Sequence, residues 1–377
     1  MLQAFKAPER PIVRSPRFAI SRRTRAFRRR FFPDADDHSW NDWRWQLRHS
    51  LRGTEALERV LQLSDDERAG LLRNRNSLPN AITPYYASLL DRADASHPLR
   101  RTMVMTSQEF ERTPEESIDP LHEDGDSPVP GLVHRYPDRV LFLTTGTCPV
   151  YCRYCTRSRV VGSNDGTYEF STGQWERAID YIARTPVIRD VLLSGGDPLI
   201  LSDDRLEWLL SRLRKIKHVE FLRIGSKVPV VLPQRITPAL VKMLKKYHPL
   251  WMSIHFIHPS ELTKEVEQSC ARLANAGIPL GSQTPLLKGV NDNVETCRAL
   301  FHGLLRFRVK PYYLYQADLV VGTSHFRTAV NKGLEIISAL RGHTTGYAVP
   351  TFAIDVPAAA ARSRCCPIPI CRARTAT

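Results

Sequence analysis

The sequence lacks any long apolar run. No stretch of its 377 residues approaches the ~20 apolar residues that a membrane-spanning helix needs, and none has the apolar centre of a secretory signal. Its eight cysteines do not show the paired spacing of a disulfide framework. These absences argue against a membrane protein and against a secreted, disulfide-stapled one. We therefore expect a protein of the reducing cytoplasm without a membrane partner.

Acidic residues are nearly absent from the N-terminus. The first 32 residues contain many arginines and a single acid, Glu9, and the whole chain has a formal net charge of +15. Such an arm could attract nucleic acid by releasing counterions, and its composition is also that of a transit peptide. No DNA-binding motif and no interleaved aromatic pattern accompanies the charge. We therefore expect residues 1–33 to be a disordered basic arm, and we do not expect a nucleic-acid partner.

The rest of the chain divides into a helical part and a part that alternates strands with helices. Residues 34–130 show helix-like spacing over 42–52 and 53–62, a capping box from Ser64 to Glu67, and an acidic, proline-bearing linker over 115–130. The later alternation predicts parallel strands with right-handed crossovers and ligands at the carboxyl ends of the strands. The predicted strands are 140–145, 190–193, 221–225, 251–256, 280–284, 311–316 and 351–354, which make six strand–helix units of a partial α/β barrel.

Three clustered cysteines follow the first of these strands. Cys148, Cys152 and Cys155 have CxxxCxxC spacing, which suits three irons of a [4Fe-4S] cluster and leaves the fourth iron open to a small molecule. A zinc site with a fourth ligand elsewhere and ordinary buried thiols are the alternatives. One strand–helix unit later, Gly195, Gly196 and Asp197 form a predicted glycine turn, whose exposed backbone groups could bind the carboxylate and ammonium of an amino acid.

With these motifs, the chain resembles the radical S-adenosylmethionine (SAM) enzymes and, more narrowly, the lysine 2,3-aminomutase family. The resemblance implies an α/β fold, namely a partial (βα)6 radical-SAM barrel with an N-terminal helical extension. The domains would be a basic arm (1–33), a helical extension and linker (34–130), the barrel (131–357) and an atypical tail (358–377). The matching stretches are 40–46, 134–139, 148–159, 224–237, 286–292, 312–327 and 340–352.

The resemblance also assigns cofactors and partners. It implies a [4Fe-4S] cluster, SAM, pyridoxal phosphate, an electron donor such as flavodoxin or ferredoxin, and a homo-oligomer. Two carboxylates that converge on one pocket need a cationic partner, which favours L-lysine over glutamate as substrate. The implied residues are Cys148, Cys152 and Cys155 for the cluster; Gly195, Gly196, Asp197, His255 and Gln283 for SAM; Arg135, Tyr136 and Arg139 for pyridoxal phosphate; and Arg157, Asp318 and Asp355 for the substrate.

One departure from the family concerns the lysine that binds pyridoxal phosphate covalently. The family segment Asp-x-Pro-Gly-Gly-Gly-Gly-Lys is replaced here by Asp355-Val-Pro-Ala-Ala-Ala-Ala-Arg362. Arginine stays protonated and does not form a Schiff base, so we expect this chain to hold pyridoxal phosphate weakly and without a covalent link. We hypothesise a reading-frame shift after Pro357, because GGC glycine codons read one base late become GCG alanine codons; a tail zinc site at Cys365, Cys366 and Cys371 is the alternative. A zinc-binding cysteine of the family is replaced by Asn293, so we expect no zinc there.

Two other functions are compatible with the sequence. The first is a related enzyme that supplies β-lysine to a translation factor, and the second is a non-catalytic metal-binding protein. The long helical extension and Thr156–Arg159 favour the enzyme that acts on free lysine.

Overall fold

The protein is built on one curved sheet. The computed structural model describes residues 18–74, 78–162, 168–355 and 363–365. In this part of the chain, the sheet has nine strands in the order β11-β10-β9-β8-β7-β6-β5-β4-β3. Strands β4 to β10 are parallel, while β3 and β11 run antiparallel at the two edges. The bounds are β3 Leu132–Tyr136, β4 Arg139–Thr145, β5 Asp190–Gly195, β6 Phe221–Ser226, β7 Leu250–His255, β8 Leu280–Leu286, β9 Lys310–Gln316, β10 Thr351–Ile354 and β11 Ser363–Arg364.

Helices separate the parallel strands, as the alternating pattern predicts. The longer ones are amphipathic: α9, for example, starts at the Ser202 cap and buries Leu206, Leu209, Leu210 and Leu213. This i, i+3, i+4, i+7 spacing places the apolar side chains on the face that packs against the sheet. All seven predicted strands and the six strand–helix units are confirmed, and β3 is an additional edge strand. The helices are α8 Thr172–Arg184, α9 Asp203–Leu213, α10 Val228–Val231, α11 Pro238–Leu244, α12 Lys264–Asn275, α13 Val294–Arg306 and α14 Val330–Leu340.

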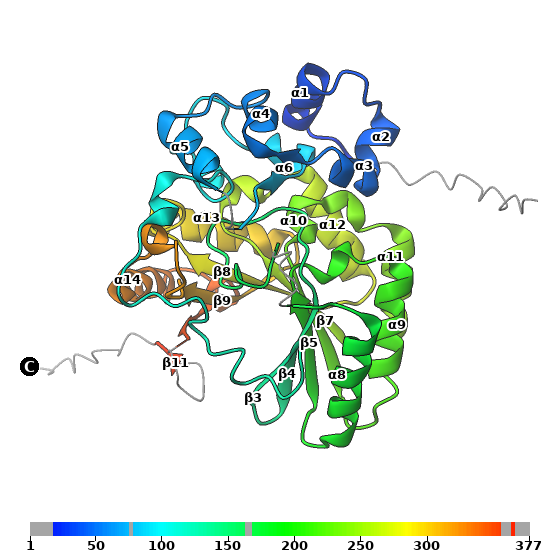
Figure 1. The fold of residues 1–377 in the computed structure, drawn as a ribbon. Coiled ribbons are helices and arrows are strands. Elements are labelled where there is room, and N and C mark those ends of the chain that lie inside the picture. The colour runs from blue at the N-terminus through cyan, green and yellow to red at the C-terminus, as the bar shows by residue number, and fades with distance from the viewer. Residues whose placement is uncertain (1–17, 75–77, 163–167, 356–362, 366–377) are drawn as a thin grey trace, which may run out of the picture.

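The N-terminal extension consists of short helices that lie together on one side of the barrel, next to α10, α12 and α13 (Figure 1). The predicted capping box is present, since Ser64 and Glu67 each accept a hydrogen bond from the other's backbone N–H. The predicted helix over 42–52 ends early, because Leu51 and Arg52 pair with Ile82 and Ala81. The elements are α1 Arg22–Phe31, α2 Asp37–Asn41, α3 Trp43–Arg48, β1 Leu51–Arg52, α4 Gly53–Glu58, α5 Asp65–Arg73, β2 Ala81–Ile82, α6 Pro84–Ala87 and α7 Pro98–Arg101.

The prediction of a disordered arm through residue 33 is wrong for residues 18–33. Helix α1 starts at a Ser21 cap, and the backbone N–H of Ser21 donates to Glu265 on α12. The guanidinium of Arg23 donates to the carbonyls of Ser88 and Leu90. Arg28 pairs with Asp37, so Arg23 and Arg28 of this segment bind carbonyl and carboxylate oxygens of the protein itself. Residues 1–17 lie outside the described part of the chain.

Buried polar contacts fix the extension to the barrel. Arg235 is fully buried, and its guanidinium lies 4.7 Å from the ring of Trp43 in α3. The hydroxyl of Tyr86 in α6 donates to Glu261, which follows β7. Among the described helices, none combines the length and apolar content required to span a bilayer.

Candidate active site

A cavity of about 650 Å³ opens at the carboxyl ends of the parallel strands. Every predicted cluster, cofactor and substrate residue in the described part of the chain lines it. Most follow the carboxyl ends of strands, as expected for a parallel sheet. Arg139 instead begins β4 and pairs with Tyr136 of β3, so the predicted pyridoxal phosphate residues lie toward the amino ends of the strands. The predicted residues that line the cavity are Cys148, Cys152, Cys155, Gly195, Gly196, Asp197, His255, Gln283, Arg135, Tyr136, Arg139, Arg157, Asp318 and Asp355.

The cysteine loop begins directly after β4 and is held in place by the N-terminal extension. Arg153, inside the motif, is 3% exposed and binds both oxygens of Glu109, with its Nη2 2.6 Å from Oε2. It also donates to the carbonyls of Leu78 and Pro79, while its backbone N–H donates to Thr102. These contacts place the cysteines at the cavity wall. Sequence reasoning missed this role, although an arginine between two cluster cysteines was a visible signal.

The glycine turn has the conformation that the sequence predicts, but its polar groups are used differently. Gly195 has a φ of +116°, and a Cβ there would lie 2.5 Å from the Thr145 carbonyl oxygen. The N–H of Gly196 donates to that carbonyl, and the N–H of Asp197 donates to Thr147. These two N–H groups are therefore not available for the carboxylate of a ligand, which corrects that part of the sequence prediction.

Asp197 is also engaged by the protein. Its buried carboxylate accepts hydrogen bonds from the Ser226 hydroxyl and from the backbone N–H groups of Leu199, Lys227 and Val228. Burial raises the pKa of Asp197, an effect that these four donors oppose. The carboxylate thus connects the glycine turn after β5 with the start of α10, and the turn lines the cavity.

His255 ends β7, and its register partner Gln283 lies in the middle of β8. Burial, together with the nearby charges of Lys227 and Arg157, lowers the pKa of His255 to about 3. The imidazole is therefore neutral near pH 7 and can donate or accept a hydrogen bond without carrying charge. The Gln283 amide nitrogen lies 3.4 Å from the hydroxyl of Tyr315.

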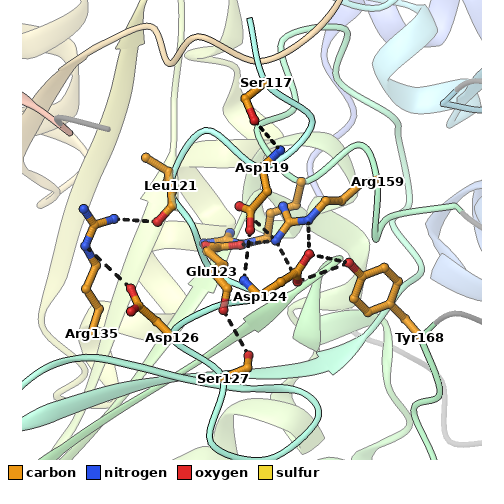
Figure 2. Close-up of polar contacts among 11 residues, drawn as sticks. Ser117, Asp119, Leu121, Glu123, Asp124, Asp126, Ser127, Arg135, Arg159 and Tyr168 are labelled. Atoms are coloured by element: carbon orange, nitrogen blue, oxygen red, sulfur yellow. Dashed lines mark hydrogen bonds and ion pairs between the residues drawn. The ribbon is translucent and has the colours of Figure 1, made fainter. Parts of the chain in front are cut away.

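A segment preceding the sheet supplies a further set of carboxylates. We call residues 116–126 the acidic strap; they belong to the acidic linker predicted over 115–130. Its Glu116 pairs with Arg327, and Ser117 forms a bridge with Val320. Leu121 and Glu123 line the cavity. The strap also contacts a residue that the sequence assigns to the cofactor, since the guanidinium of Arg135 donates to the Leu121 carbonyl (Figure 2).

The predicted substrate residues have partners in this arrangement. Glu123 of the strap binds Arg157, and the Thr156 hydroxyl donates to Asp318 at 2.8 Å. Burial opposes the charge of Arg157, but the attraction and hydrogen bonds from Glu123 outweigh it and raise the pKa of the guanidinium. Asp355 follows β10 directly and lines the same cavity. The wall of the cavity thus offers an arginine for an anionic group and carboxylates for a cationic group.

Comparison with known proteins identifies the family. Residues 142–300 match the family model of the Radical SAM superfamily. An L-lysine 2,3-aminomutase from Fusobacterium nucleatum is 54% identical over 330 residues, which cover 88% of this chain and 77% of the relative. The chain belongs to the lysine 2,3-aminomutase family of radical SAM enzymes. The family and the partial barrel predicted from the sequence are both confirmed.

Other relatives of this family agree with that assignment. An L-lysine 2,3-aminomutase from Clostridium subterminale is 53% identical over 326 residues, covering 86% of this chain and 78% of the relative. A glutamate 2,3-aminomutase from Clostridioides difficile is 42% identical over 321 residues, covering 85% of this chain and 75% of the relative. The family therefore includes relatives named for two different amino acids.

Membership of the lysine 2,3-aminomutase family implies a [4Fe-4S] cluster, SAM and pyridoxal phosphate, and the three cysteines fit the cluster. Burial raises the pKa of Cys148 and Cys152, and it raises that of Cys155 to about 11. Thiolates at these positions therefore need a cation such as iron beside them. In the described part of the chain, no three His, Cys, Asp or Glu side chains are placed to hold one metal ion. A cluster does not require that placement, because each cysteine binds a different iron.

The described residues fit pyridoxal phosphate only in part. Arg135 and Arg139 line the cavity, and a guanidinium suits a phosphate because it donates two parallel hydrogen bonds. Lys227 is the one lysine that the described residues contribute to this wall, and Glu261 binds its ammonium at 2.7 Å. Arg362, which the sequence prediction places at the position of the family's covalent lysine, lies outside the described residues. The described wall thus supports non-covalent binding and offers no uncommitted lysine for a Schiff base.

Proposed function

We propose that this chain is a 2,3-aminomutase that interconverts L-lysine and L-β-lysine. One observation carries the proposal: a single cavity is lined by the three cysteines, by Arg157 and by the carboxylates of Asp318 and Asp355. Lysine carries one carboxylate and a distant ammonium, so it complements this combination of charges. Glutamate would place a second carboxylate near Asp318 or Asp355, and burying like charges together is costly.

Each group in the wall has a defined task in this proposal. Arg157 binds the substrate α-carboxylate with its planar fork, and Asp318 and Asp355 bind the ε-ammonium. Arg135, Tyr136 and Arg139 hold the phosphate and ring of pyridoxal phosphate, while the glycine turn, His255 and Gln283 hold SAM. When bound, the three cofactors supply the radical and the nitrogen-carrying chemistry of amino migration. The chain's own contribution is to orient the substrate and to exclude water from the cavity.

The tail sequence limits this activity. Because position 362 is an arginine, we expect pyridoxal phosphate to bind weakly and without a covalent link. Borohydride reduction checks this expectation, since a reduced pyridoxyl adduct on a lysine of this chain would contradict it. Replacing residues 358–362 by Gly-Gly-Gly-Gly-Lys should create that adduct and increase turnover.

The decisive experiment is turnover of labelled lysine under anaerobic, reducing conditions, with a ferredoxin or flavodoxin as electron donor. It compares the unchanged chain with the variant that carries the glycine-rich lysine segment, and labelled glutamate is the control substrate. Formation of β-lysine without β-glutamate supports the proposal. Formation of β-glutamate alone, or material that holds zinc and no iron–sulfur centre, would refute it.

A further inference from the structure

Glu123 of the acidic strap is a buried carboxylate at the cavity wall that no sequence motif identifies. It is 5% exposed, and it contacts the side of the Arg157 guanidinium. Nε of Arg157 lies 3.0 Å from both carboxylate oxygens of Glu123, and Nη2 lies 2.7 Å from Oε1. Glu123 therefore occupies the edge of the guanidinium formed by Nε and Nη2.

The other edge of the Arg157 guanidinium is left for a second anion. Arginine has five N–H donors arranged along two edges, each able to bind a carboxylate in a bidentate manner. Among the described residues, no hydrogen-bond partner is found for Nη1 of Arg157. Because Arg157 lines the cavity, the edge formed by Nη1 and Nη2 can receive a substrate carboxylate while Glu123 keeps the opposite edge.

The strap itself is anchored independently of Arg157. Figure 2 shows the guanidinium of Arg159 among the strap carboxylates, 3.1 Å from Asp119, 3.4 Å from Glu123 and 3.1 Å from Asp124. The backbone carbonyl of Glu123 accepts a hydrogen bond from the hydroxyl of Ser127. Glu123 is consequently a fixed carboxylate and not a mobile surface side chain.

A fixed carboxylate beside Arg157 restricts the orientation of its guanidinium. The long arginine side chain loses rotamer entropy when it is immobilised. Arg157 also shares its cavity with Asp318 and Asp355, the carboxylates that the ε-ammonium of lysine requires. Pairing with Glu123 holds the guanidinium in one orientation before substrate binds, which lowers the entropic cost of binding.

We propose that Glu123 is a positioning residue for the substrate α-carboxylate and acts through Arg157. The inference rests on the proposed function, because it takes an amino acid as the ligand. Glu123 would thus favour ligands that carry an α-carboxylate over ligands that carry only the ε-ammonium. It is not a catalytic residue, since its carboxylate contacts Arg157 and not the reacting atoms.

Binding measurements test this inference without turnover. The full chain, loaded anaerobically with its cluster and SAM, is dialysed at equilibrium against labelled L-lysine or labelled 1,5-diaminopentane. The diamine keeps the distant ammonium and lacks the carboxylate. Glu123→Gln should raise the dissociation constant for lysine about tenfold, the effect of losing one charge-assisted contact, and should change that for the diamine less than about twofold.

Two further variants serve as a control and as a conservative replacement. Asp124→Asn removes a contact between the strap and Arg159 without touching Arg157, so it should change both dissociation constants less than about twofold. Glu123→Asp keeps the charge and should retain part of the lysine affinity, and it replaces Glu123→Gln if the latter does not fold.

Several outcomes would overturn the inference. They are an unchanged or tighter affinity of the Glu123 variants for lysine, an equal loss for both ligands, or an equal loss in Asp124→Asn. Failure of the unchanged protein to bind lysine at all would instead reject the proposed function, and the inference with it.

Discussion

The buried ion pair between Lys227 and Glu261 provides a strong test of the structure. The two side chains are 9% and 0% exposed, and their charged atoms lie 2.7 Å apart. Glu261 also accepts hydrogen bonds from the Tyr86 hydroxyl and from the backbone N–H of Ile257, both at 2.7 Å. Lys227 lines the cavity, so the pair connects the N-terminal extension to the active-site wall. We predict that Lys227→Met destabilises the fold severely.

The magnitude follows from the distance and the burial. At an effective dielectric constant of about 20, two charges at this separation attract each other by roughly 6 kcal/mol, which largely offsets the cost of burying them. Removing the lysine leaves the carboxylate of Glu261 buried without its countercharge. The expected loss in the free energy of unfolding is therefore about 3–5 kcal/mol. Neutralising the carboxylate as well, in Lys227→Met/Glu261→Gln, should restore about 2 kcal/mol of that loss.

Urea unfolding under anaerobic conditions measures these differences through the midpoint and the slope. A matched control is Lys246→Met, because Lys246 and Glu207 lie 2.8 Å apart but are 56% and 36% exposed. An exposed pair of this kind contributes about 1 kcal/mol or less. The reasoning fails if Lys227→Met costs no more than Lys246→Met, or if the double variant is less stable than Lys227→Met alone.

Three further predictions follow from single residues. Burial and neighbouring arginines lower the pKa of His325 to about 4. Between that value and the ordinary pKa of about 6.5, the unfolded chain binds more protons than the folded chain, so stability falls as the pH falls. The loss in unfolding free energy from pH 7 to pH 5 should therefore be about 2 kcal/mol smaller in His325→Gln than in the unchanged chain. Asp197→Ala leaves buried N–H donors without an acceptor and should cost about 3 kcal/mol in urea unfolding, while Asp197→Asn should keep part of that stability; equal losses would contradict this role. Arg153→Met should lower iron per chain after anaerobic reconstitution, because the cysteine loop loses its bidentate contact with Glu109, and full iron content would reject that anchoring role.

Much of the barrel could be predicted from the sequence. Apolar runs and helical periodicity depend on neighbouring residues, and they locate the strands from β4 to β10 and the helices between them. The carboxyl ends of parallel strands meet at one edge, so residues such as Cys155, His255 and Asp355 could be assigned to one site. The edge strand β3 was missed because its residues include His134 and Arg135, which do not form an apolar run.

The family and the cysteine motif could be recognised from the sequence alone, which also predicts that Arg362 replaces the Schiff-base lysine, because each is a property of residues close together in the chain. The partners that fix the site follow from the fold and not from any local pattern. Glu123 and Arg157 are 34 residues apart, and so are Lys227 and Glu261. No local pattern selects one carboxylate among many for a distant cation; folding brings these charges together, and burial then makes each pairing specific.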